Sequence, residues 1–218
     1  MIKAIIFDLD GTLADTIDDI TDGLNGMLAE YGFDNVTRKD TLSNINNGAF
    51  ELVRRSLPKD KQDDEFVKEA KKVYEKHYST CYKNKTHEYA GCTKALQELK
   101  ESGISLSVLS NKQDEFVKSL IAKLFPNISF DFVIGQGPFP TKPDPSSVNY
   151  ILKNVGVSQD EAVIVGDSNV DMITAKNANI KAVGVDWGYR SREILLENGA
   201  CAIVNDPIEL SRVPNILI

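Results

Sequence analysis

Two aspartates that follow a short apolar run are the first candidates for chemistry in this sequence. Asp8 and Asp10 come directly after residues 4–7, in the stretch AIIFDLDGT. Carboxylates this close repel one another, and their removal from water is unfavourable unless a positive charge accompanies them. The stretch is therefore either an ordinary Asp-Gly-Thr turn or a site that holds a cation and does chemistry.

Polar side chains of complementary chemistry stand in the segments that follow later apolar runs. The runs are ISLSVL, FDFVIG and AVIVG, and the polar residues after them are Ser110, Asn111, Lys112, Lys142, Asp167, Ser168 and Asp171. In a doubly wound sheet, ligands bind beyond the carboxyl ends of the strands. If these runs are strands of one sheet, we expect the polar groups to meet at one edge of it.

Carboxylates, a hydroxyl and a lysine together suit a phosphoryl group held against a hard divalent cation. Mg²⁺ prefers oxygen ligands and usually takes one or two carboxylates from the protein, and Asp8 and Asp167 can supply these. The charge of the metal would offset the repulsion between the aspartates. Asp10 then need not bind metal through its side chain, and it is the candidate for proton transfer.

Short apolar runs alternate with amphipathic segments through most of the chain. The runs expected as strands are rich in Ile and Val and hardly alternate in polarity: 2–7, 104–109, 130–135, 162–167, 181–186 and 201–204. The segments expected as helices are 93–103, 114–125, 146–156, 169–179 and 191–199. This alternation predicts an α/β fold, a doubly wound parallel sheet with helices on both faces.

The region after the first strand departs from this rhythm. Residues 15–85 contain no convincing strand, and three segments in them carry apolar residues at helical spacing: 15–32, 49–57 and 64–82. We therefore expect an inserted α-helical domain at 15–85 and a core domain formed by residues 1–14 and 86–218.

Composition and charge limit the classes of binding partner and the cellular compartment that we expect for this protein. The 218 residues are 42% hydrophobic, enough for a sizeable core, and the net charge of −7 argues against nucleic acid or an anionic membrane as the main partner. The three cysteines form no CxxC pair, which is typical of a reduced protein. The first residues run straight into a strand, which leaves no room for a signal peptide. We expect a cytoplasmic protein whose partner is a small phosphorylated metabolite, and the sequence leaves the oligomeric state open.

Four motifs, DLDGT, SN, KP and GDSNVD, stand in this order at the ends of successive predicted strands. They resemble the motifs of the haloacid dehalogenase superfamily, and the helical insert resembles the cap of its phosphoglycolate phosphatase-like branch. The resemblance covers nearly the whole chain and implies a Rossmann-like core with a helical cap that selects the leaving group. It also implies Mg²⁺-dependent hydrolysis of small phosphomonoesters, with 2-phosphoglycolate as the leading substrate.

The resemblance implies a role for each matching residue. Asp8 would be the nucleophile that forms an aspartyl-phosphate, and Asp10 would protonate the leaving alkoxide and then deprotonate the hydrolytic water. Since halide departure needs no proton donor, Asp10 favours phosphoryl transfer over dehalogenation. The other implied roles are phosphate binding by Ser110, Asn111 and Lys142, metal binding by Asp8, Asp167 and the backbone carbonyl of Asp10, and support from Ser168 and Asp171. Asp171 would orient either a metal-bound water or Lys142.

Substrate preference and local structure carry further expectations. NNGAF at residues 46–50 stands where the specificity loop of the cap would be, so Asn47, Gly48 and Arg54 are the candidate specificity residues. We interpret Thr12 and residues 187–189 as structural. Asn179 stands where relatives mostly have Gly, and we expect it to adopt the left-handed conformation there.

Two alternatives remain open from the sequence. One is a β-phosphoglucomutase-like phosphosugar mutase or a pyrophosphatase of the same superfamily, which would keep the same core residues. The other is a non-catalytic binding or regulatory module on the same fold. The intact set of Asp8, Asp10, Lys142 and Asp167 argues against that module.

Overall fold

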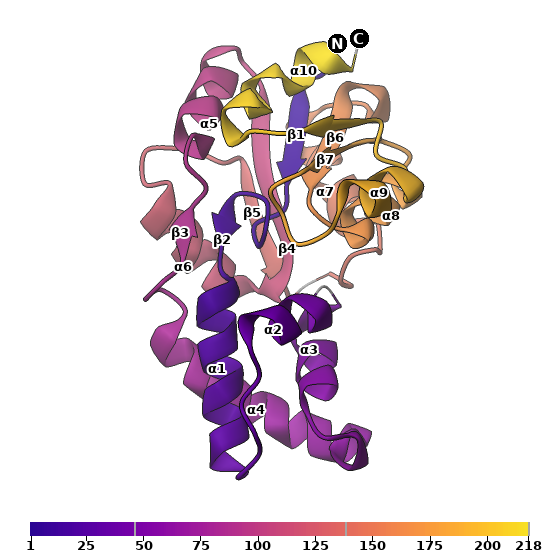
Figure 1. Ribbon diagram of the computed structural model, residues 1–218. Helices are drawn as coiled ribbons and strands as arrows, with labels where there is room; N and C mark the ends of the chain where they lie inside the picture. Colours follow the sequence, from indigo (N-terminus) through magenta and orange to yellow (C-terminus); the bar gives the residue numbers. More distant parts are fainter. Residues whose placement is uncertain (46, 138, 218) are drawn as a thin grey trace. The chain divides into compact units, whose positions relative to one another are not determined.

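The computed structural model describes residues 1–45, 47–137 and 139–217. The chain divides into two compact units (Figure 1). One comprises Met1–Ala14 and Glu88–Ile218, and the other comprises Asp15–His87. The two crossings of the chain between the units, β2 (Ala14–Asp15) and β3 (His87–Glu88), pair as a two-stranded ribbon.

A six-stranded sheet forms the centre of the first unit, in the order β5-β4-β1-β6-β7-β8. Its strands are β1 (Ala4–Phe7), β4 (Ser105–Gln113), β5 (Phe132–Gln136), β6 (Ala162–Gly166), β7 (Lys181–Val185) and β8 (Ala202–Val204). All neighbouring strands run parallel. β1 and β6 are buried along their whole length, which is why their Ile and Val runs show no polar alternation.

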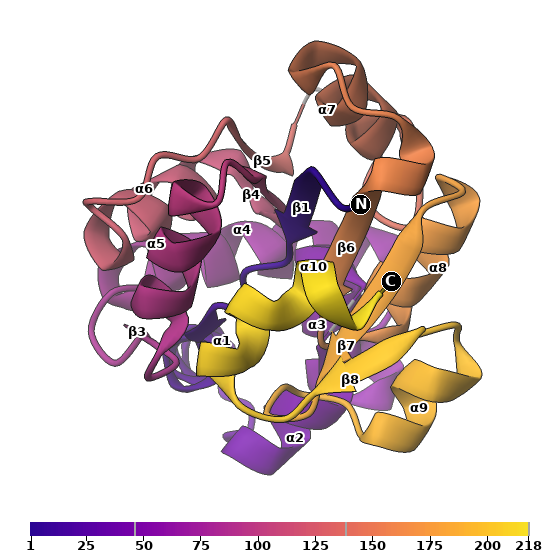
Figure 2. The same cartoon turned by 90° about the horizontal axis from the view of Figure 1, so that it is seen from above.

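Helices cover both faces of this sheet (Figure 2). On one face lie α5 (Cys92–Glu101) and α6 (Asp114–Leu124), and on the other lie α7 (Ser146–Val155), α8 (Asn169–Asn177) and α9 (Arg192–Glu197). The chain ends in η3 (Pro207–Arg212), which packs on α5, and α10 (Val213–Ile216). The predicted doubly wound α/β fold is confirmed.

β4 extends further than the sequence predicts. The apolar run ends at Leu109, but the strand continues to Gln113, which pairs with Gln136 of β5 after an irregularity in the register. The polar residues Ser110 to Lys112 therefore lie within the irregular end of the strand and not after it. The prediction was wrong here because it ended the strand at the first polar residue, whereas an irregular strand end next to a site carries polar side chains.

The elements that the structure describes between the two ribbon strands of the inserted unit are all helical. Its elements are α1 (Ile17–Glu30), α2 (Arg38–Asn44), α3 (Gly48–Ser56), η1 (Lys59–Lys61) and α4 (Asp64–Cys81). The sequence did not predict α2, because that helix buries only Thr41 and has no apolar stripe. A capping box begins it instead: the Thr37 side chain accepts from the N–H of Asp40, and the Asp40 carboxylate accepts from the N–H of Thr37.

α1 and α4 form the main contact of the helical unit, and glycines allow their close approach. A Cβ atom on Gly23 would lie 3.1 Å from the Tyr74 ring, and one on Gly26 would lie 2.6 Å from Nδ1 of His77. The rings of Tyr74 and Tyr78 stack with centroids 5.5 Å apart. Larger residues at these glycines would push the two helices apart.

Asn179, directly after α8, confirms a local expectation. Its φ of +55° is in the left-handed region, where Asn is better tolerated than most residues. Its N–H donates to the carbonyl of Lys176 at 3.1 Å, which closes the end of the helix. Asn thus serves at a turn for which Gly is the usual choice.

The longest helix of the described residues is α4, and it carries charged residues along its length. Across the part of the chain that the structure describes, none of the helices combines the length and the apolar character of a membrane span.

Candidate active site

The predicted site residues of the core meet at the carboxyl ends of three adjacent strands. Asp8 follows β1, Ser110 lies near the end of β4, and Asp167 follows β6. β1 lies between β4 and β6, at the point where the strand order reverses. Lys142, from the loop between β5 and α7, reaches the same place.

The Lys142 ammonium joins two of the carboxylates. Its Nζ lies 2.9 Å from Oδ1 of Asp8 and 2.6 Å from Oδ1 of Asp171, and its side chain is only 5% exposed. The other oxygen of Asp171 accepts hydrogen bonds from the N–H and the hydroxyl of Ser168, at 3.1 and 2.6 Å, in a capping box that begins α8. The start of α8 therefore fixes Asp171, and Asp171 fixes Lys142 beside Asp8. Of the two roles expected for Asp171, the orientation of Lys142 is the one that a direct contact supports.

Asn111 fastens the loop that carries Lys142. Its Nδ2 donates to the carbonyl oxygen of Lys142 at 2.9 Å, and the N–H of Lys142 donates to its Oδ1 at 2.7 Å. The next peptide bond, Lys142–Pro143, is cis. From the sequence, Asn111 is expected only to bind phosphate. Its side chain has a second task, which is to hold the backbone of Lys142.

Asp167 is held by groups from two loops of the core. The Thr12 hydroxyl donates to its Oδ1 at 3.2 Å, and the N–H of Tyr189 donates to its Oδ2 at 2.8 Å. The indole N–H of Trp187 donates to the carbonyl of Thr12 at 3.1 Å, which ties the two loops together. Residues 187–189, interpreted from the sequence as structural, therefore contact a predicted metal ligand. Their position after β7, at the same sheet edge, is the signal that could have found them.

Two glycines make room for the Asp167 side chain. A Cβ atom on Gly188 would lie 2.1 Å from Cβ of Asp167, and one on Gly11 would lie 2.3 Å from its Oδ2. Gly11 also has a φ of +87°, which few other residues adopt. The carboxylate is thus enclosed by backbone that only glycine allows to come this close.

Asp10 faces a different cation from Asp8. The Lys112 ammonium lies 2.9 Å from Oδ1 of Asp10, and the two side chains are 8% and 15% exposed. The N–H of Lys112 donates to the Ser110 hydroxyl at 3.2 Å. The sequence placed Lys112 at this sheet edge without a role, and the structure brings it onto the predicted acid/base.

Burial and mutual repulsion govern the ionisation of the carboxylates. Burial raises the pKa of Asp8 to about 7, and the carboxylates of Asp171 and Asp10 add to this rise against the opposing effect of Lys142. Burial, together with the charges of Asp8 and Asp171, raises the pKa of Asp167 well above its usual value. Burial alone would lower the pKa of Lys142, but Asp171 and Asp8 outweigh it and raise that pKa, so the ammonium stays charged. One ammonium does not offset the charge of the carboxylates around it.

The carboxylates of Asp8, Asp167 and Asp171 fit a divalent cation. One oxygen from each lies within 4.8 Å of the others, and all three side chains are buried. A donor set made only of oxygen is the kind that Mg²⁺ prefers. A cation here would reverse the repulsion that raises the pKa values of Asp8 and Asp167. The residues therefore fit the predicted metal, with Asp171 as a further carboxylate close to it.

A family model described as "Haloacid dehalogenase-like hydrolase" matches residues 5–185, a span that contains Asp8, Lys142 and Asp171. The chain belongs to this family. The resemblance drawn from the four motifs is therefore confirmed.

Relatives of this hydrolase match it over nearly the whole chain. A phosphoglycolate phosphatase of Pseudomonas savastanoi pv. phaseolicola is 30% identical over 94% of this chain and 76% of its own length. The phosphoglycolate phosphatase of Aliivibrio fischeri is 32% identical over 88% and 87%. A crystal structure from Lactobacillus delbrueckii subsp. bulgaricus, provisionally described as a phosphoglycolate phosphatase, has a TM-score of 0.90 at 31% identity and covers 97% of this chain and 98% of that one.

The candidate specificity residues of the hydrolase lie at the two ends of α3. Asn47 precedes the helix and accepts from Nη2 of Arg55 at 3.0 Å, and Gly48 begins it with a φ of +78°. Arg54 makes ion pairs with Glu51 and Asp64 at 3.2 and 2.6 Å. Asn46 of the same loop lies outside the described residues. A substrate contact by Asn47, Gly48 or Arg54 stays a prediction.

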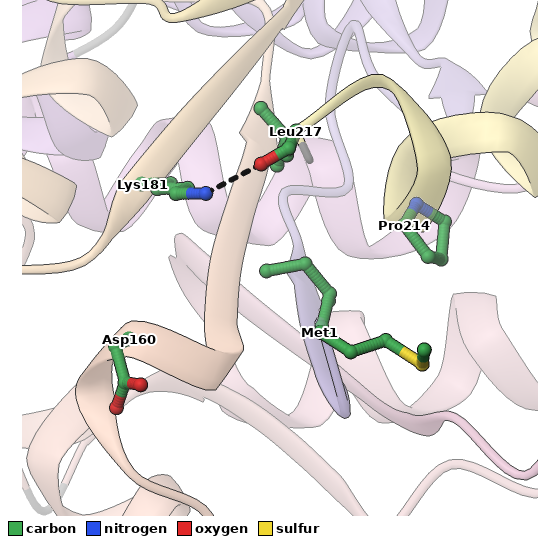
Figure 3. A pocket seen from close by; sticks show the side chains of 6 residues that line it. Met1, Asp160, Lys181, Pro214 and Leu217 are labelled. Atoms are coloured by element: carbon green, nitrogen blue, oxygen red, sulfur yellow. Dashed lines mark hydrogen bonds between the residues drawn. The ribbon is translucent and has the colours of Figure 1, made fainter.

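A small pocket of the hydrolase lies at the opposite edge of the sheet (Figure 3). Its volume is about 150 Å³, and its lining residues are Met1, Ile2, Asp160, Lys181, Pro214 and Leu217. Because Ile2 precedes β1 and Lys181 begins β7, the pocket is at the amino ends of the strands. The ammonium of Lys181 donates to the carbonyl of Leu217 at 2.6 Å. We interpret the pocket as a gap in the packing of the C-terminal segment.

The enclosure of Asp167 leads to a first prediction. Gly188→Ala should destabilise the hydrolase by about 1–3 kcal/mol, because the new methyl group forces Asp167 or the loop aside. It should also weaken the response to Mg²⁺, measured as the rise in melting temperature with added metal. Gly137→Ala is the matched control, since a Cβ atom there would lie 4.0 Å from Cβ of Asp114, which is an ordinary contact distance. A Gly188→Ala protein that melts and responds to Mg²⁺ as the wild type does would contradict the packing account.

Proposed function

We propose that this hydrolase is a Mg²⁺-dependent phosphatase of small phosphomonoesters that works through an aspartyl-phosphate on Asp8. The observation that carries the proposal is the meeting of Asp8, Lys142 and Asp167, from distant parts of the chain, at one sheet edge. The family and the relatives, hydrolases of phosphoric monoesters, agree with this chemistry.

In the first step a carboxylate oxygen of Asp8 attacks the phosphorus atom of the ester. The new O–P bond forms on Asp8 as the bond from phosphorus to the alcohol oxygen breaks, and Asp10 gives its proton to the departing alkoxide. The Lys142 ammonium, 2.9 Å from Asp8, offsets negative charge on the nucleophile and on the transferring group. Ser110 and the amide of Asn111, both on β4, would donate hydrogen bonds to the phosphoryl oxygens.

In the second step water hydrolyses the aspartyl-phosphate. Asp10, now ionised, takes a proton from the water, whose oxygen attacks phosphorus and releases the carboxylate of Asp8. Inorganic phosphate leaves and the enzyme returns to its starting state. Asp10 thus alternates between acid and base, which requires its carboxyl group to stay in one place through both steps.

Asp8, Asp167 and the backbone carbonyl of Asp10 would hold the Mg²⁺ ion. When bound, the ion supplies positive charge that brings the substrate anion and the Asp8 carboxylate together. Thr12, Tyr189 and Gly188 keep the Asp167 carboxylate in position for this task. The two phosphoglycolate phosphatase relatives make 2-phosphoglycolate the first substrate to test.

The test is the release of inorganic phosphate from a panel of phosphorylated metabolites, with Mg²⁺ and with excess chelator. We expect phosphate release from phosphomonoesters, including 2-phosphoglycolate, and a loss of at least about 100-fold in chelator, because the metal contributes several kcal/mol of charge stabilisation. Added Mg²⁺ should restore the rate.

Other outcomes of the same panel contradict the proposal. Isomerised sugar phosphate without free phosphate would identify a mutase, and release from pyrophosphate alone would identify a pyrophosphatase. An absence of turnover on every compound would favour a binding module. Full activity in chelator would exclude the metal from the mechanism.

A further inference from the structure

Lys112 contacts the predicted acid/base, and none of the roles above uses it. Its Nζ lies 2.9 Å from Oδ1 of Asp10, and its side chain is only 8% exposed. An ammonium removed from water to this extent is stable only beside a partner of opposite charge. The contact is therefore a fixed feature of the site and not a loose surface ion pair, which would contribute little.

The position of Lys112 in β4 makes the contact well defined. Its N–H donates to the Ser110 hydroxyl at 3.2 Å, and the strand beyond it is paired where Gln113 meets Gln136 of β5. The backbone that carries the lysine is thus held on both sides. Three consecutive residues of this strand end then have different roles: Ser110 is the proposed phosphate donor, Asn111 holds the backbone of Lys142, and Lys112 contacts Asp10.

Acid and base catalysis depends on the geometry of the proton donor. A well-placed general acid or base contributes about 10²- to 10⁴-fold to the rate, and a shift of about 1 Å in a reacting group loses a large part of such a factor. Asp10 directly precedes a turn that Gly11 makes with a φ of +87°. An ammonium within hydrogen-bond distance limits the directions that this side chain takes.

We propose that Lys112 is a positioning residue that holds the Asp10 carboxyl group in the direction from which it exchanges protons with the leaving group and with water. The inference rests on the proposed phosphatase function, since it gives Asp10 the same acid/base role. Lys112 acts through Asp10 and does not itself contact the reacting atoms.

The experiment is a double-mutant cycle on the folded, Mg²⁺-loaded enzyme with the best phosphomonoester of the panel. Lys112→Met and Lys112→Arg are made in the wild type and in Asp10→Asn, and Lys153→Met, an exposed lysine of α7, is the matched control. Steady-state kcat and KM are measured for the variants that keep Asp10, and single-turnover rates with excess enzyme are measured for all variants, so that slow ones remain measurable. Thermal melts establish that each variant is folded, and Lys112→Arg carries the test if Lys112→Met does not fold.

We expect Lys112→Met to lower kcat by about 10- to 100-fold and to leave KM within about threefold of the wild-type value. The loss of a supporting contact has an effect of this size, and the effect cannot exceed that of removing Asp10 itself. Lys112→Arg should lose less, since it keeps the charge. In the Asp10→Asn background the same Lys112 changes should alter the rate by no more than about twofold, because there is no acid/base left to position. Lys153→Met should behave as the wild type.

Several results would overturn the inference. If the effects of Lys112→Met and Asp10→Asn multiply, Lys112 acts independently of Asp10. If KM rises and kcat does not change, Lys112 binds the substrate anion directly. Wild-type kinetics in Lys112→Met would remove the inference and leave the phosphatase function intact. A wild-type enzyme without activity on the whole panel would remove both.

Discussion

Asp8→Asn is expected to abolish turnover and to leave the protein folded. The amide cannot attack phosphorus as a carboxylate does, and loss of a covalent nucleophile costs about 10⁶-fold in kcat in an enzyme where it has been measured. Phosphate release from the best substrate should fall below detection. Circular dichroism and thermal melts, measured on the same sample, separate loss of chemistry from loss of fold.

The melting temperature of Asp8→Asn should be similar to that of the wild type or higher when both are in chelator. Burial raises the pKa of Asp8 to about 7 in the folded protein, whereas an Asp in an unfolded chain titrates near 3.9. The unfolded chain therefore releases this proton at lower pH, and the Asp8 carboxyl reduces stability progressively as the pH rises from about 4 to about 7. Asn does not titrate, so its advantage should be small at pH 4 and largest at pH 8.

A matched control makes this result specific. Asp34→Asn changes an exposed aspartate of the helical unit and should affect neither turnover nor the pH dependence of melting. Unfolding of Asp8→Asn would identify Asp8 as a structural residue. Retention of substantial turnover would mean that another group receives the phosphoryl group.

Lys142→Met is expected to impair both stability and turnover. It removes the cation that lies 2.9 Å from Asp8 and 2.6 Å from Asp171, and it leaves two buried carboxylates beside one another. Removal of one partner of a buried ion pair destabilises proteins by about 3–5 kcal/mol. Loss of one fixed group that stabilises the transition state lowers kcat by about 10²- to 10³-fold.

A second substitution separates these two effects. Lys142→Met combined with Asp171→Asn removes one of the unpaired carboxylates, so it should recover part of the lost stability while turnover stays low. Lys176→Met, an exposed lysine of α8, is the control for the loss of a lysine. The measurements are denaturant unfolding and single-turnover phosphate release. A folded Lys142→Met enzyme with a rate within about twofold of the wild type would contradict the electrostatic role.

The apolar runs made the core of this fold predictable. Strands buried on both faces, such as β1 and β6, need continuous Ile and Val, and that pattern is visible without a structure. Once the strands are known to be parallel, their carboxyl ends must share an edge. The approach of Asp8 and Asp167 follows from this topology. In the structure, one carboxylate oxygen of Asp8 lies within 4.8 Å of one carboxylate oxygen of Asp167.

Two of the features that the sequence did not predict depend on contacts between distant residues, and a third, α2, depends on a local cap. The backbone N–H of Tyr189 donates to Asp167 and the indole N–H of Trp187 donates to the carbonyl of Thr12, and neither contact leaves a pattern in residue types. The pairing of Lys112 with Asp10 depends on the irregular end of β4, which re-aims the lysine toward the site. α2 begins with a capping box and has no apolar stripe, so hydrophobic periodicity does not reveal it. That the inserted helical unit acts as a cap, and that its residues select the substrate, are still predictions.

The most direct test of the account is to locate the phosphoryl group on the enzyme during turnover. The enzyme is mixed with Mg²⁺ and its best substrate, quenched in acid within a single turnover, digested and analysed by mass spectrometry. We predict one phosphoryl group on the peptide that contains Asp8, reducible by borohydride at that residue and absent from Asp8→Asn. Turnover with the phosphoryl group on another residue, or with none on the protein at any time, would contradict the account.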